Sequence, residues 1–278
     1  MNELFVMSLR AKHRSEGTIR EYAKAIDNCL EYVNKPETEI KPIDLELWQS
    51  SMSNLSSASV AQRTSAVREY FKFLYRNEFI SRNPAEMLEA PQIKNREQSA
   101  LNGKQVRAMV NAATNERNKA IIMMLAQTGL RIHELANITL EQYESRSNNI
   151  LVIRGKGDKD RLVGLADETI ELIDSYIANE RKDGCEYLFV GNRGNKMDGK
   201  NTSAMLKVCA RKAGIENWEE LHISNHTMRR TFATMMSEAD VPIEVISKAM
   251  GHSGIQITSR YVKRTEQRAV NAMSVVNF

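Results

Sequence analysis

Apolar residues recur at spacings of three and four along most of the chain, and this helical period is the feature that most limits how it can fold. Thr18 can cap the first such segment, and Ser57 or Ser59 can open the last one before residue 90. Prolines interrupt the pattern between them. The first 90 residues therefore predict a small helical bundle, with segments over 19–33, 45–52 and 57–74.

A polar stretch separates this bundle from the rest of the chain. The pairs Asn83-Pro84 and Ala90-Pro91 lead into Gln92 to Ser99, where no apolar period exists. A chain of 278 residues is also longer than a usual single domain. We therefore expect a helical domain over 1–90, a linker over 91–100 and a second domain over 101–278.

The second domain is expected to be mainly helical with one small sheet. Two short apolar runs, Asn149 to Ile153 and Arg161 to Leu165, flank a polar and cationic turn and read as a β-hairpin. Gly129 is a natural helix stop. The remaining apolar patterns predict helices over 105–113, 115–127, 131–136, 168–177, 202–212, 227–238, 242–250 and 265–276.

Bulk properties exclude several classes of protein. No run approaches the roughly 18 apolar residues that a membrane helix needs, so we expect a cytoplasmic protein without a membrane partner. Cys29, Cys185 and Cys209 form no C-x-x-C pair, which argues against a disulfide framework and a zinc site. The net charge of +4 permits a polyanionic partner without demanding one.

Four local patterns carry groups that could perform chemistry, and each alone is weak. Arg131 follows Gly129 closely, with Glu134 three residues on, which is ordinarily a surface helix pair. His226 and Arg229 share one helical face. The other two patterns are a lysine at the hairpin tip, Lys156, and a histidine with a tyrosine nine residues later, His252 and Tyr261.

Taken in order, these residues resemble the tyrosine recombinase, or phage integrase, family. Thr128 to Leu135, Gly155 to Arg161, His226 to Thr234 and Met250 to Ser253 with a downstream tyrosine carry the resemblance. It implies a core-binding, SAM-like helical domain followed by a catalytic domain, in a compact arrangement similar to Xer-type recombinases and small integrases of mobile elements. Arg230 departs from the family pattern, which has histidine there.

The resemblance implies an enzyme that cuts and rejoins DNA. Attack on a phosphodiester places negative charge on two non-bridging oxygens, which the planar forks of Arg131 and Arg229 are suited to bind. His252 would donate to the same phosphate. Tyr261 would be the nucleophile and His226 the base that takes its proton.

The leaving 5′ oxygen also needs a proton, and the family assigns that role to the hairpin lysine, here Lys156. Glu134 would orient Arg131 or a histidine. The product would be a 3′-phosphotyrosyl bond that stores the energy of the broken linkage, so we expect neither a cofactor nor a metal ion. No G-x-x-x-x-G-K-[ST] phosphate loop is present in the sequence.

The expected partner is double-stranded DNA at specific sites. Arg20, Lys24, Arg63, Lys72 and Arg230 are candidate contacts. In the family a C-terminal helix docks on a neighbouring subunit, which implies a tetramer on two DNA sites and leaves accessory proteins open. Dimer resolution, integration, excision and inversion differ in the DNA sites and not in the active-site residues.

Two alternatives remain at this point. A type IB topoisomerase uses nearly the same residues but relaxes supercoils without exchanging partners. A DNA-binding regulator that kept the fold and lost the reaction is the other. A metal-dependent nuclease is less favoured, and activity that persists in EDTA would exclude it.

Overall fold

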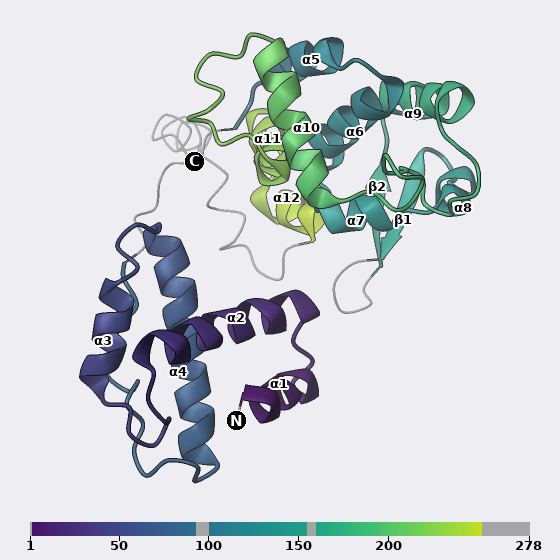
Figure 1. Ribbon diagram of the computed structural model, residues 1–278. Helices are drawn as coiled ribbons and strands as arrows, with labels where there is room; N and C mark the ends of the chain where they lie inside the picture. Colours follow the sequence, from purple (N-terminus) through teal and green to yellow (C-terminus); the bar gives the residue numbers. More distant parts are fainter. Residues whose placement is uncertain (1, 93–99, 155–159, 252–278) are drawn as a thin grey trace, which may run out of the picture. The chain divides into compact units, whose positions relative to one another are not determined.

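The computed structural model describes residues 2–92, 100–154 and 160–251 (Figure 1). The chain divides into two compact units, Met1–Arg96 and Glu97–Phe278. The domain limits predicted from the sequence stay a prediction. Lys156, His252, Tyr261 and the C-terminal helix expected over 265–276 lie outside the described residues.

The described part of the first unit contains helices joined by turns and irregular segments, and no strand. Ser15 caps α2, because its Oγ accepts the Thr18 N–H at 3.2 Å, and Ser56 caps α4 by accepting the Ser59 N–H at 3.2 Å. The expected caps Thr18 and Ser57 or Ser59 were therefore wrong by one to three residues. The helices are α1 (Asn2–Ala11), α2 (Glu16–Val33), α3 (Pro42–Ser50) and α4 (Ser57–Arg76).

Aromatic side chains fill the core of this unit. Trp48 is fully buried, and its indole N–H donates to Asn28 Oδ1 at 3.1 Å. Phe5 packs edge-on against Tyr70 with ring centroids 5.4 Å apart. This contact anchors α1, which the sequence did not predict, to α4. Tyr70 satisfies its buried hydroxyl by donating to Glu37 at 2.9 Å.

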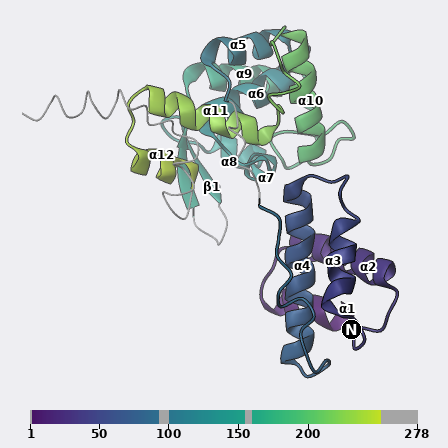
Figure 2. The ribbon, with the colours of Figure 1, turned by 90° about the vertical axis from the view of Figure 1, so that its left-hand side faces the viewer.

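A buried helix, α6, organises the second unit and packs against α5, α9 and α11 (Figures 1 and 2). Its buried residues run almost all round the helix, as expected for a central position. The helices of this unit are α5 (Gly103–Ala112), α6 (Glu116–Thr128), α7 (Ile132–Asn137), α8 (Leu140–Glu144), α9 (Asp167–Asn179), α10 (Gly199–Lys212), α11 (Asn225–Glu238) and α12 (Ile243–Met250). The expected class, mainly helical with one small sheet, is confirmed.

The sheet is an antiparallel pair, β1 (Ile150–Arg154) and β2 (Asp160–Gly164). Leu151 pairs with Val163, and both are buried. Leu162, on the opposite face, is 68% exposed. Side chains alternate along a strand, so one face of the hairpin packs on the domain and the other meets solvent.

In the described part of the chain, every helix is too short or too polar to pass through a membrane.

Candidate active site

The turn between α6 and α7 places Arg131. Gly129 ends α6 with φ of +59°, a left-handed conformation that favours glycine. A Cβ at this position would lie 2.4 Å from Cδ1 of Phe232 on α11. Two residues later, Arg131 is the N-cap of α7. The backbone conformation of Gly129 therefore determines the position of the Arg131 backbone, from which its side chain extends.

Glu134 holds Arg131 at two points. Its Oε2 accepts the Arg131 backbone N–H at 2.7 Å, and its Oε1 accepts Arg131 Nη1 at 3.0 Å. A further arginine, Arg161 on β2, donates Nη2 to Oε2 at 2.7 Å. The carboxylate is almost completely buried. Burial alone would raise the pKa of Glu134, but the Arg131 N–H, the charge of Arg161 and the Arg131 guanidinium together lower that pKa.

Arg229 lies on the first turns of α11 and is buried, with 4% of its surface exposed. Its Nη1 donates to the carbonyl of Gly129, and its Nη2 donates to the carbonyl of Met250 at 2.5 Å. One guanidinium thus joins the end of α6 to the end of α12. A planar fork can reach two separated acceptors from two different nitrogens, whereas all the donors of a lysine lie on one nitrogen.

The C-terminal end of α12 receives three arginines on consecutive carbonyls. Besides Arg229 on Met250, Arg161 Nη1 donates to the Ala249 carbonyl at 2.5 Å and Arg131 Nη2 to the Gly251 carbonyl at 3.2 Å. The last carbonyls of a helix lack partners within the helix and carry partial negative charge. Two predicted catalytic arginines therefore converge directly before residue 252.

His226 lies one turn before Arg229 on α11, at the surface of the unit. Partial desolvation and the nearby charges of Arg230, Arg229 and Arg131 lower its pKa below the ordinary value of 6.5. The imidazole is solvent-exposed, so we attribute its low pKa more to the arginine charges than to burial. At neutral pH the imidazole is therefore neutral and able to accept a proton.

Arg230 is buried, with 7% of its surface exposed, and its Nη2 donates to Thr227 Oγ1 at 3.2 Å. Its charge acts on His226 from within the same helix. Arg230 as a DNA contact stays a prediction.

The structure thus brings four of the predicted residues, Arg131, Glu134, His226 and Arg229, into one region. Sequence reasoning missed Arg161, which it treated as the start of an apolar strand. The available signal was its place in the strand: it shares a face with Val163, where alternation expects an apolar side chain that packs on the domain.

The candidate DNA contacts of the first unit divide between two surfaces. Lys24 and Arg63 line a groove between α2 and α4, whereas Lys72 lines another together with Arg68 and Arg76. Arg63 and Lys72 are nine residues apart on α4, which is about two and a half turns, so their side chains leave opposite sides of the helix. Arg20 is exposed on α2. These four residues therefore do not form a single cluster.

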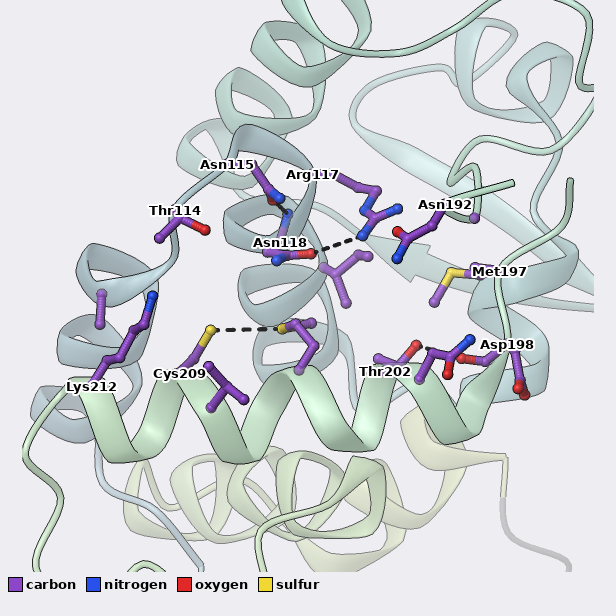
Figure 3. Close-up of a pocket in the computed structure, with 16 residues that line it drawn as sticks. Thr114, Asn115, Arg117, Asn118, Asn192, Met197, Asp198, Thr202, Cys209 and Lys212 are labelled. Carbon is purple, nitrogen blue, oxygen red and sulfur yellow. Dashed lines mark hydrogen bonds between the residues drawn. The ribbon is translucent and has the colours of Figure 1, made fainter. Parts of the chain in front are cut away.

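A separate cavity of about 340 Å³ lies between α10 and the start of α6 (Figure 3). Asn115, Arg117 and Lys212 are among its polar lining, and Met205 is among its apolar lining. None of the described catalytic candidates lines it.

Comparison with known proteins assigns the family. The Phage integrase family matches residues 99–268, and the Phage integrase, N-terminal SAM-like domain matches residues 3–78. Together these matches span both units. The chain therefore belongs to the phage integrase family, the tyrosine recombinases, which are enzymes that cleave and rejoin DNA strands.

Within this family the chain is a Xer-like, two-domain member. It is 30% identical to Tyrosine recombinase XerA of Pyrococcus horikoshii over 274 residues, covering 98% of this chain and 91% of the relative. It is 28% identical to Tyrosine recombinase XerD of Vibrio cholerae over 269 residues, covering 91% and 88%. These comparisons favour neither the topoisomerase nor the silent regulator.

The fold is also that of solved recombinases. The crystal structure of XerH site-specific recombinase bound to palindromic difH substrate, a post-cleavage complex, has a TM-score of 0.75 at 21% identity, covering 92% of this chain and 79% of that one. At this level of identity the likeness concerns the fold alone.

Proposed function

We propose that this tyrosine recombinase exchanges double-stranded DNA at specific sites through a 3′-phosphotyrosyl bond to Tyr261. The observation that carries the proposal is the convergence of Arg131 and Arg229 on the adjacent carbonyls of Gly251 and Met250. These guanidiniums would meet the two non-bridging oxygens of the scissile phosphate, where negative charge develops in the transition state.

The described geometry suits Arg131 to this role. Its side chain is 31% exposed, and only two of its guanidinium N–H groups donate to described residues, one to Glu134 and one to Gly251. The other N–H groups can donate to a phosphate. Arg229 is more deeply buried and would bind the phosphate from the protein side. It would also hold the ends of α6 and α12 through its bonds to the Gly129 and Met250 carbonyls.

The proton transfers are assigned by the family resemblance. A neutral His226 would accept the proton of the Tyr261 phenol, whose ordinary pKa is about 10. Lys156 would protonate the departing 5′ oxygen, and His252 would donate to the phosphate. Rejoining reverses these steps with the 5′-hydroxyl of a partner strand, which attacks the phosphotyrosyl bond and releases the phenol.

A pH titration tests the role of His226. We expect the cleavage rate to fall as the pH drops through the His226 pKa, because the protonated imidazole cannot accept the phenol proton. Arg230→Gln removes one of the charges that lower this pKa, so the acidic limb should move to higher pH. Single-turnover cleavage profiles measure the limb, and NMR titration of the imidazole carbon, assigned with His226→Gln, measures the pKa directly. If Arg230→Gln raised the imidazole pKa of His226 but left the acidic limb of the cleavage profile unchanged, His226 would not be the base.

DNA binding would use both units. Lys24 and Arg63, which share a groove, and Arg20 on the same helix as Lys24 are proposed backbone contacts of the first unit. Lys72, in the other groove, is a further proposed contact. We also propose that the active form is a tetramer on two DNA sites, linked by the C-terminal segment.

A covalent-trapping experiment tests the function. A duplex selected from a random-sequence library by binding to the Tyr261→Phe protein is nicked beside the cleavage position, so that the released fragment cannot be rejoined. The native protein should form a denaturation-resistant adduct in EDTA, whereas Tyr261→Phe should bind and form none. Two differently labelled sites should then yield exchanged products. Relaxation of supercoils without exchange would contradict recombination.

A further inference from the structure

Arg161 occupies a position that strand geometry reserves for an apolar side chain. It pairs with Ile153 in the hairpin, and it lies on the same face as Val163, which is buried against the rest of the second unit. Its side chain is only 12% exposed. Placing a guanidinium in such a position costs free energy of solvation, so it must be compensated by partners.

The partners of Arg161 belong to two elements that are distant in sequence. Its Nη2 donates to Glu134 Oε2 at 2.7 Å on α7, and its Nη1 donates to the Ala249 carbonyl at 2.5 Å on α12. Arg161 therefore links the hairpin to the two segments that carry Arg131 and the residues before position 252. Charged and directional bonds of this kind fix both distance and orientation.

Glu134 passes this link on to Arg131. The Oε2 that receives Arg161 also receives the Arg131 backbone N–H at 2.7 Å, and Oε1 receives Arg131 Nη1 at 3.0 Å. A second route runs through the end of α12, because Arg161 Nη1 donates to the Ala249 carbonyl at 2.5 Å, two residues before the Gly251 carbonyl that accepts Arg131 Nη2 at 3.2 Å. Loss of Arg161 would remove one partner from each of the two supports of the Arg131 guanidinium, Glu134 and the end of α12.

We propose that Arg161 is a positioning residue for DNA cleavage, which sets the orientation of Arg131 through Glu134 and through the end of α12. This inference rests on the proposed function. Arg161 itself does not contact the scissile phosphate, and its effect on the rate is the effect of a correctly aimed Arg131.

A neutral phosphate analogue separates this role from general support of the fold. A methylphosphonate at the scissile position replaces one charged oxygen with a methyl group, so there is less charge for Arg131 to neutralise. On the ordinary phosphate we expect Arg161→Met to cleave about 100-fold more slowly than the native protein, as for a misplaced catalytic group. On the methylphosphonate the native-to-variant ratio should fall close to one, and Arg131→Ala should behave in the same way.

Rates are measured at saturating protein, with the fraction of bound duplex determined in parallel. Arg181→Met is the matched control, because Arg181 is also partly buried and donates to the Leu188 and Tyr187 carbonyls, in the same unit and outside the candidate site. Its ratio to the native protein should not depend on the probe. Arg161→Lys keeps the charge without the fork, and it replaces Arg161→Met in the comparison if that variant does not bind DNA.

An Arg161 defect of equal size on both probes would overturn the positioning role and leave the recombinase proposal intact, as would a native cleavage rate. Absence of a Tyr261-dependent adduct from the native protein on the ordinary duplex would overturn both.

Discussion

Replacement of Arg229 by alanine is expected to lower the rate of DNA cleavage about 1000-fold. The guanidinium is proposed to meet charge that develops on the scissile phosphate, and loss of one preorganised donor to such charge costs about 100- to 1000-fold. Arg229 also bonds the Gly129 and Met250 carbonyls, so the variant loosens the site as well as removing a donor. Arg229→Lys should remain strongly impaired, because the single nitrogen of an ammonium cannot span the Gly129 and Met250 carbonyls and also meet a phosphate with the geometry of a fork.

The measurement is single-turnover formation of the covalent adduct on the nicked duplex, beside a gel-shift assay of binding. Added guanidinium ion should restore part of the activity of Arg229→Ala and none of that of Tyr261→Phe. If Arg229→Ala formed the adduct at the rate of the native protein, Arg229 would have no role in the reaction.

Gly129→Ala is expected to be the substitution with the largest effect on folding. The new Cβ would lie 2.4 Å from Phe232 Cδ1, and the φ of +59° is unfavourable for alanine. Left-handed backbone costs about 1–2 kcal/mol for a residue with a Cβ, and overpacking costs about 1–3 kcal/mol more. The sum is a large part of the roughly 5–15 kcal/mol that stabilises a typical domain.

Urea unfolding measures this loss. Trp218 packs on the core of the second unit, so its fluorescence in a Trp48→Phe background follows that unit alone. Gly164→Ala is the control, since nothing lies within 4 Å of its added Cβ and it should change the unfolding free energy by less than about 1 kcal/mol. In Gly129→Ala with Phe232→Ala the two losses should not add, because the ring that causes the clash is gone. Strictly additive losses would argue against the clash.

The sequence predicted what local chemistry determines. Gly129 ends a helix because its conformation requires no Cβ, and the alternation around Leu151 and Val163 places the hairpin on the domain. Two helices, α1 and α8, were not predicted. Helix α1 is held by the packing of Phe5 on Tyr70, and α8 has only five residues, too few to show a period.

The candidate site was predicted in part for a similar reason. Order and spacing identified Arg131, His226 and Arg229, since each belongs to a continuous motif. The partners of Arg161 lie 27 residues before it and 88 residues after it. Such a link depends on how helices pack around the hairpin, and no local pattern reveals it.

Three arginines donate to the successive carbonyls of Ala249, Met250 and Gly251. These bonds fix the rotation of α12 about its own axis. One extra residue inserted within this helix would turn those carbonyls by about 100° relative to the helix start and shift them by about 1.5 Å, which misaligns all three donors together. Changes of length should therefore be tolerated far less within α12 than in the loop between α9 and α10. The spacing between His226 and His252 is accordingly a mechanical constraint on the chain as well as a signature in its sequence.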